Sequence, residues 1–161
     1  MLDALLSSID GLNEEQLELL GRRLYAEHCV APARAGRVAT HDGEPVWIYP
    51  DDFDHAFFTA ASKHRRGWAK DVVDPLRVAR ASWIVPVIGG HVPGTSCYRV
   101  VDFGAYKKPP PEKRLYVMRE ECYVVWLLPR GSGGWRFKTA YVTGHGDISR
   151  YTRRQRKIWE R

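Results

Sequence analysis

The residues best suited to chemistry lie in the last third of this 161-residue sequence, in a segment that ends FKTAYVT. Residues 114–143 contain three apolar stretches separated by two turns, and they predict three consecutive strands. The last stretch, residues 135–143, carries a group of basic and hydroxyl side chains: Arg136, Lys138, Thr139 and Tyr141. Cations and hydroxyls bind phosphate, and the aromatic rings of the same stretch can stack on nucleic-acid bases. The segment therefore indicates a surface that handles phosphate groups.

Strand geometry decides which of these side chains can act together. Strict alternation places Thr139 and Tyr141 on the same face as the other aromatic residues of the stretch, and it turns Arg136 and Lys138 to the opposite face. A β-bulge would change that division. Taken by themselves, these residues favour an ordinary core strand over a phosphate site.

Positive charge is concentrated towards the C-terminal end. The chain has a net charge of +6, and residues 127–161 contain nine Lys or Arg residues and two acids, so this segment holds +7 and the preceding 126 residues hold −1. We expect a helix over residues 147–161, capped by Asp147. Its basic face comprises Arg153, Arg154, Arg156 and Lys157. Such a face either binds the phosphate backbone of nucleic acid regardless of base sequence, or is a solvated face that only aids solubility.

Helices are predicted ahead of the strands. Residues 1–28 predict two helices broken at Asp10-Gly11, and the second begins with a capping box between Asn13 and Gln16. We expect this helical extension to cover one face of the sheet, although a docking or dimer element is the alternative. Residues 29–36 have the composition of a linker.

The segments that follow would position the candidate site residues. A hairpin with an Asp42-Gly43 turn precedes a helix from about residue 51 to residue 66, which carries His55. A second helix begins at Asp74-Pro75 and carries Arg77 and Arg80 on one face. Beyond it we expect a strand at 95–102 and a rigid, proline-rich surface connector at 107–113.

Together these elements predict a single α+β domain, with helices packed on one face of a mostly antiparallel sheet. Residues 37–143 would form its core, between the N-terminal helices and the basic C-terminal helix. No apolar run is long enough for a membrane span, and the N-terminus has no secretory signal pattern. The three cysteines form no CxxC pair, which favours a reduced, cytoplasmic environment.

Most established catalytic motifs are missing from the sequence. It contains no P-loop, no GxGxxG after a strand, no GxSxG, no HExxH and no EF-hand loop. The Gly-Ser-Gly-Gly at 131–134 lies between two predicted strands, so a hairpin turn explains it better than a phosphate cradle. We therefore expect no cofactor and no metal site.

The order of four short segments resembles the Barnase–EndoU–colicin–RelE (BECR) superfamily of ribonucleases and toxins, in particular its phage and mobile-element branches. The segments are FDHAFF at 53–58, DPLRVARASWI at 74–84, YVVWL at 123–127 and FKTAY at 137–141. The resemblance covers about residues 44–143 and leaves both terminal regions outside. It implies a BECR-like fold and a toxin or phage-encoded effector.

The resemblance also implies a reaction, the metal-independent cleavage of RNA by attack of the 2′-hydroxyl on the adjacent phosphate. It assigns His55 as general base or acid, Arg80 as the clamp on the scissile phosphate, with Arg77 as its alternative, and Thr139 and Tyr141 as phosphate-binding or positioning groups. The basic residues that we expect to bind RNA are Arg77, Arg136, Lys138, Arg153, Arg154, Arg156 and Lys157.

Several alternatives stay open from the sequence. His64 and His145 are further candidates for the acid–base role. The chain could instead be a nucleic-acid-binding module without catalysis, or an interaction protein such as a phage-encoded inhibitor of a host enzyme. The expected partner is RNA, with tRNA as one candidate substrate. A cognate immunity protein or antitoxin is a second candidate partner, and no membrane partner is expected. The sequence leaves the oligomeric state undetermined.

Overall fold

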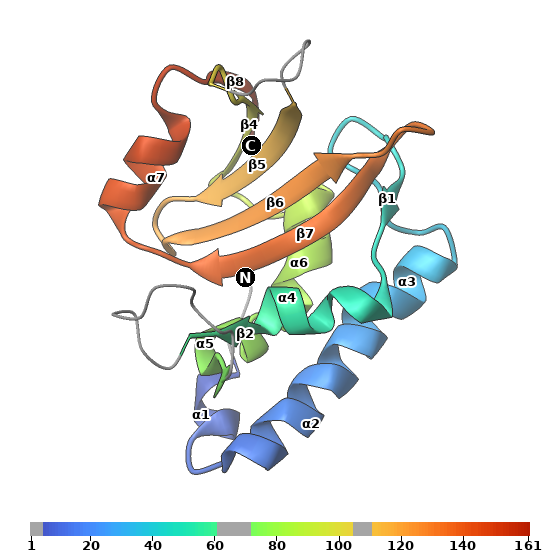
Figure 1. Ribbon diagram of the computed structural model, residues 1–161, viewed down its shortest axis with the longest axis vertical. Coiled ribbons are helices and arrows are strands. Elements are labelled where there is room, and N and C mark those ends of the chain that lie inside the picture. The colour runs from blue at the N-terminus through green and yellow to red at the C-terminus, as the bar shows by residue number, and fades with distance from the viewer. Residues whose placement is uncertain (1–4, 61–71, 105–110) are drawn as a thin grey trace.

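The computed structural model describes residues 5–60, 72–104 and 111–161 of the chain. Its centre is a six-stranded sheet with the order β1-β7-β6-β5-β4-β8 (Figure 1). The strands are β1 (Val46–Trp47), β4 (Thr95–Val101), β5 (Glu112–Met118), β6 (Tyr123–Pro129), β7 (Trp135–Val142) and β8 (Arg156–Glu160). All neighbours pair antiparallel except β1 and β7, which are parallel. This confirms an α+β fold with a mostly antiparallel sheet.

The four strands predicted from apolar stretches and turns are present within a residue or two of their expected limits. The turn between β6 and β7 depends on Gly133 and Gly134, whose φ angles of 97° and 71° favour glycine. At Gly134 a Cβ atom would also lie 2.6 Å from the Pro45 carbonyl oxygen. This glycine therefore allows the turn to approach the segment that leads into β1.

Most of the helices, and two short strands outside the sheet, precede β4 in sequence. They are α1 (Leu6–Ile9), α2 (Glu14–Tyr25), the π-helix η1 (Ala26–Val30), α3 (Ala31–Arg34), η2 (Pro50–Asp52), α4 (Phe53–Phe57), β2 (Phe58–Thr59), β3 (Val72–Val73), α5 (Pro75–Val78), η3 (Ala81–Trp83) and α6 (Ile84–Ile88). The capping box is confirmed, because the Gln16 amide donates to Asn13 Oδ1 at 2.8 Å and the Asn13 amide donates to Gln16 Oε1 at 3.1 Å. Asp74 caps α5 as expected, accepting from the Leu76 amide at 2.9 Å.

Two predictions about the N-terminal half are wrong. Residues 29–36 are mainly helical rather than a linker, since η1 and α3 prolong α2 and bury Cys29 and Val30 in the core. The helix expected to reach residue 66 ends at Phe57, because Phe58–Thr59 then pairs with Val72–Val73 as a two-stranded sheet. Residues 61–71 lie outside the described part of the chain.

The basic C-terminal helix predicted for residues 147–161 is also wrong. Helix α7 (His145–Thr152) is short, its N-cap is Gly144 rather than Asp147, and Arg154 adopts a φ of 59° in the turn after it. The remaining basic residues form strand β8, which pairs with β4 at an edge of the sheet. Burial favours the strand, because Trp159 packs against the core and stacks on His41 with ring centroids 4.7 Å apart.

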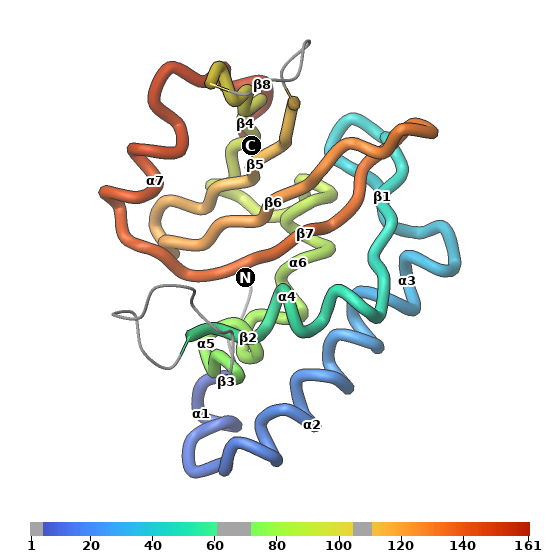
Figure 2. Tube along the Cα trace, in the orientation of Figure 1, coloured from blue at the N-terminus to red at the C-terminus, as the bar shows by residue number. Residues whose placement is uncertain are grey.

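Helices lie on both faces of the sheet rather than on one. Along β5, Tyr116 and Met118 belong to the larger core, which helices α2 to α6 share. Leu115 and Val117 belong to a smaller core, together with Ile148 of α7. The chain trace in Figure 2 shows α7 separated from the other helices. Among the described helices, none is both long enough and apolar enough to cross a bilayer.

Candidate nucleic-acid site

A β-bulge in β7 determines which side chains share the α7 side of the sheet. Trp126 pairs with Thr139, but the next residue of β6, Leu127, pairs with Phe137, so Lys138 is the extra residue. The bulge shifts the alternation by one, so that Phe137 stays in the larger core while Tyr141 packs on the smaller core. The strict division that turned Lys138 away from Thr139 and Tyr141 is therefore wrong.

These side chains line one shallow pocket of about 190 Å³. Its described lining consists of Lys113, Trp126, Lys138, Thr139 and Tyr141. Lys113 comes from β5, Trp126 from β6 and the others from β7, so three adjacent strands form its floor. We call this the sheet pocket. It combines two cations, a hydroxyl and two aromatic rings, which are the groups that bind phosphate and stack on bases.

Burial and like charge lower the pKa of Lys138. Desolvation is the larger cause, and the positive charge of Lys113 is the second. Within the described residues neither lysine forms an ion pair. A bound anion would relieve the repulsion between them, so the electrostatics of the sheet pocket favour a negatively charged ligand.

Arg77 reaches the sheet pocket from helix α5, which packs against β7. Its Nη1 donates to the Ala56 carbonyl oxygen at 2.9 Å and to Thr139 Oγ1 at 3.4 Å. Its guanidinium carbon lies 5.0 Å from the centroid of the Tyr141 ring, and its Nε lies 3.3 Å from a carboxylate oxygen of Asp74. Arg77 is thereby fixed beside Thr139, with 13% of its side chain exposed.

An aromatic network forms the wall between the sheet pocket and α7. Trp126 Nε1 donates to the Tyr141 hydroxyl at 3.1 Å, and that hydroxyl donates to the Tyr151 hydroxyl at 3.1 Å. The rings of Trp126 and Tyr151 meet edge to face at 5.4 Å. Burial raises the pKa of Tyr141, so its hydroxyl stays protonated. Because both bonds already engage that hydroxyl, Tyr141 positions its neighbours more readily than it exchanges protons.

The three candidate histidines occupy different environments. His55 is exposed on α4, directly before Ala56, whose carbonyl oxygen binds Arg77. Helix α4 also packs against β7, the strand that carries Thr139. His145 instead contacts Cys122, with its Nε2 3.4 Å from the sulfur atom. His64 lies outside the described residues.

Among the described residues, Arg80 forms no hydrogen bond or ring contact with any side chain that lines the sheet pocket. Its side chain is buried, Nη1 donates to the Leu76 carbonyl oxygen at 3.1 Å, and the guanidinium carbon lies 5.0 Å from the Trp83 ring centroid. Arg80 was the preferred phosphate clamp from the sequence, whereas Arg77 is the arginine that contacts Thr139 and Tyr141.

The remaining basic residues lie apart from this group. Arg136 forms an ion pair with Asp52 at 2.7 Å and packs over the Tyr49 ring, so its charge is already balanced. The C-terminal basic residues are all exposed, at the end of α7 and along β8: Arg153, Arg154, Arg156 and Lys157. Three strands separate β8 from β7, so this basic edge is a second cationic region.

Three residues of the pocket region were missed in the sequence. Lys113 was assigned to a surface connector, but β5 begins at Glu112 and includes it. Trp126 appeared only within the predicted strand segment YVVWL, and Tyr151 was not singled out as a site residue. Polar-tipped aromatic residues on a predicted strand and on the helix that follows it were the available signal.

The described residues contain no group of three or more His, Cys, Asp or Glu side chains placed to hold a metal ion. Comparisons with protein-family models, curated proteins and solved structures found no significant match to this chain.

Proposed function

We propose that the chain is a ribonuclease that cleaves RNA by 2′-hydroxyl attack, and that its fold is a BECR-type variant. The observation that carries the proposal is the contact of Arg77 with Thr139 and Tyr141, beside two lysines that form no ion pair with any described residue. These three residues come from the DPLR and FKTAY segments on which the family resemblance rests, and Arg77 lies 62 or more positions before the other two. Both segments therefore contribute to one surface rather than to separate parts of the fold.

In the proposed reaction the RNA backbone lies across the sheet pocket. Lys113 and Lys138 neutralise phosphate charge, and Arg77 and the Thr139 hydroxyl donate hydrogen bonds to the scissile phosphate. As the 2′-oxygen attacks phosphorus, the charge on the phosphate oxygens increases, so these fixed donors stabilise the transition state more than the ground state. Trp126 offers a face for base stacking at the edge of the pocket.

Proton transfer completes the proposed reaction. The 2′-hydroxyl loses its proton to a base as its oxygen attacks, the bond from phosphorus to the 5′-oxygen breaks, and that oxygen takes up a proton. The products are a 2′,3′-cyclic phosphate and a free 5′-hydroxyl. His55 is the proposed proton-transfer group, because a histidine titrates near neutral pH and this one lies on the helix whose carbonyl oxygen holds Arg77.

Cleavage of RNA in EDTA tests the proposal directly. The purified chain is incubated with total RNA and with a tRNA pool, and the fragment ends are identified. We expect discrete fragments with 2′,3′-cyclic phosphate ends, and we expect their loss in His55→Ala and in Thr139→Val. His28→Ala is a matched control, since His28 lies in the π-helix rather than on β7 or α4.

A binding module without catalysis is the second candidate, and the contacts within the sheet pocket favour it in one respect. The hydroxyl of Tyr141 is held by two partners, and Arg77 is held by Asp74 and Ala56, which suits a static binding surface. Salt-sensitive retention of RNA without cleavage would select this candidate. An immunity protein or antitoxin as partner remains a prediction, as does a cytoplasmic location.

A further inference from the structure

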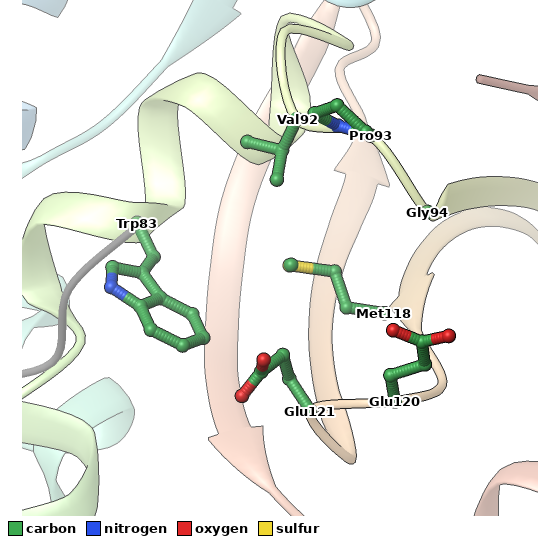
Figure 3. A pocket seen from close by; sticks show the side chains of 7 residues that line it. All are labelled: Trp83, Val92, Pro93, Gly94, Met118, Glu120 and Glu121. Carbon is green, nitrogen blue, oxygen red and sulfur yellow. The ribbon is translucent and has the colours of Figure 1, made fainter. Parts of the chain in front are cut away.

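A second pocket, of about 330 Å³, lies at the other side of the sheet (Figure 3). Residues from η3, the α6–β4 loop, the end of β5 and the β5–β6 turn line it: Trp83, Val92, Pro93, Gly94, Met118, Glu120 and Glu121. Met118 belongs to the larger core, on the face opposite to the smaller core on which the sheet pocket's Trp126 and Tyr141 pack. We call it the turn pocket.

The interior of the turn pocket is apolar. Trp83, Val92 and Met118 are each less than a tenth exposed and belong to the larger core. In Figure 3 their side chains border a common space, with the Met118 sulfur directed into it. One face of Trp83 already carries the Arg80 guanidinium, at 5.0 Å from the ring centroid. An aliphatic or aromatic body would bury its surface against these walls.

The mouth of the turn pocket is acidic. Glu120 and Glu121 are exposed, and neither forms an ion pair or a hydrogen bond within the described residues. Figure 3 shows the Glu121 carboxylate beside the space bordered by Trp83. On a chain of net charge +6, two adjacent carboxylates without cationic partners at the mouth of an apolar pocket complement a ligand that carries positive charge.

An unsatisfied hydroxyl lies beside the same pocket. Thr95 follows Gly94 and pairs with Met118 across β4 and β5, so its side chain is on the same face as Met118. Thr95 is fully buried, and its Oγ1 has no hydrogen-bond partner among the described residues. Buried polar groups are nearly always bonded, so this hydroxyl next to the pocket wall is a candidate hydrogen-bonding group for a ligand.

The dimensions favour a small ligand over a protein. Ligand pockets commonly measure about 300–1,000 Å³ and combine apolar walls with a few polar groups. A protein interface needs about 20–30 residues on each side. Seven described residues line the turn pocket, and none of the exposed large apolar residues is among them: Leu6, Leu19, Leu76 and Phe103.

We propose that the turn pocket binds a small organic amine, with its apolar body against Trp83, Val92 and Met118 and its ammonium group beside Glu120 and Glu121. This site is independent of the proposed RNA cleavage, because it opens on the other side of the sheet. The ammonium group supplies the positive charge that the two carboxylates lack.

The test uses the whole ¹⁵N-labelled chain and two probes of matched shape, 3-phenylpropylamine and the neutral 3-phenylpropan-1-ol. We expect the amine to shift the indole signal of Trp83 and the amide signals of Met118 and Glu121. We expect the alcohol to bind about tenfold more weakly, which corresponds to about 1.4 kcal/mol. The double variant Glu120→Gln, Glu121→Gln should lose that tenfold preference while keeping the wild-type spectrum elsewhere.

Glu160→Gln is the control, because Glu160 is an exposed glutamate on β8 outside the pocket lining. It should bind the amine like the wild type. Equal binding of amine and alcohol would overturn the proposal, as would an amine preference that survives in the double variant. Shifts confined to residues outside the turn pocket, or no shifts at all, would overturn it as well.

Discussion

In the variant Arg77→Lys, we expect RNA cleavage to fall by about 10²–10³-fold, the usual cost of removing one preorganised donor to a developing oxyanion. Lysine keeps the positive charge but has a single ammonium group. Arg77 binds the Ala56 carbonyl oxygen at 2.9 Å, Thr139 Oγ1 at 3.4 Å and Asp74 at 3.3 Å at the same time. A lysine can replace the ion pair with Asp74 but not all three contacts.

The effect on stability follows from the same contacts. The bond from a charged donor to the Ala56 carbonyl oxygen is the shortest of the three, and such bonds contribute about 1.5–3 kcal/mol. The longer contact with Thr139 and the stacking over Tyr141 add less, and the ion pair is partly retained. We therefore expect Arg77→Lys to lower the free energy of unfolding by about 2 kcal/mol, measured by urea denaturation.

Arg80→Lys is the matched control, three residues along the same segment. Arg80 is also buried and also stacks on an aromatic ring, but its described partners are Leu76 and Trp83 rather than residues of the sheet pocket. It should lose comparable stability while cleaving RNA at about the wild-type rate. Single-turnover rates on one short RNA, measured below the unfolding temperature of both variants, make the comparison. Loss of cleavage in Arg80→Lys with retention in Arg77→Lys would refute the assignment of the phosphate clamp.

Three further predictions concern stability and reactivity. The Arg114 guanidinium donates hydrogen bonds of 2.7 and 2.9 Å to the two carboxylate oxygens of Asp42 and holds the pKa of Asp42 well below its usual range. The pair therefore stabilises the fold above about pH 4, and this contribution is lost as the pH falls further. Because 42% of the Asp42 side chain is exposed, Asp42→Asn should lower the free energy of unfolding by only about 1 kcal/mol at pH 7, and by less at pH 3, as measured by urea denaturation. An equal loss at both pH values would contradict this. Iodoacetamide should label Cys122 alone in the native chain, because Cys29 and Cys97 are fully buried. The variant His145→Ala should be labelled more slowly, as followed by mass spectrometry, because the His145 imidazole can accept the Cys122 thiol proton. Equal labelling rates would rule out that role for His145. Deleting Lys138 should leave cooperative thermal unfolding intact, because Phe137 and Thr139 would become consecutive partners of Leu127 and Trp126 and the residues on both sides would keep their faces. Loss of cooperative unfolding in this variant would show that the fold requires the bulge.

The central strands were predictable because their signals are local. Alternating apolar residues and glycine-rich or acidic turns mark β4 to β7, and the structure places them close to the expected limits. The C-terminal basic segment was wrongly predicted as a helix because its residue pattern fits a helix as well as a strand. Only the pairing with β4 and the burial of Trp159 beside His41 select the strand, and both involve residues distant in sequence.

The site was partly predictable for a similar reason. Thr139 and Tyr141 stand out by residue type, and Arg77 was recognised as an alternative to Arg80. Choosing between the two arginines requires knowing how α5 docks on β7, which no local pattern encodes. The position of Lys138 depends on the bulge, which arises from the pairing of β6 and β7 rather than from strand propensity.

The order of strands in the sheet has a consequence for folding. Strands β4, β5, β6 and β7 pair with their neighbours in sequence, whereas the pairings of β1 with β7 and of β8 with β4 join distant segments. Short-range pairings cost less loop-closure entropy, so the four-strand meander is the natural folding nucleus, and its amides should exchange with solvent most slowly. The floor of the sheet pocket belongs to that nucleus, while Arg77 and His55 arrive with the helices. The two halves of the proposed site therefore come from different folding units, and local unfolding of the helices would remove the proposed phosphate clamp and leave the lysine and aromatic floor intact.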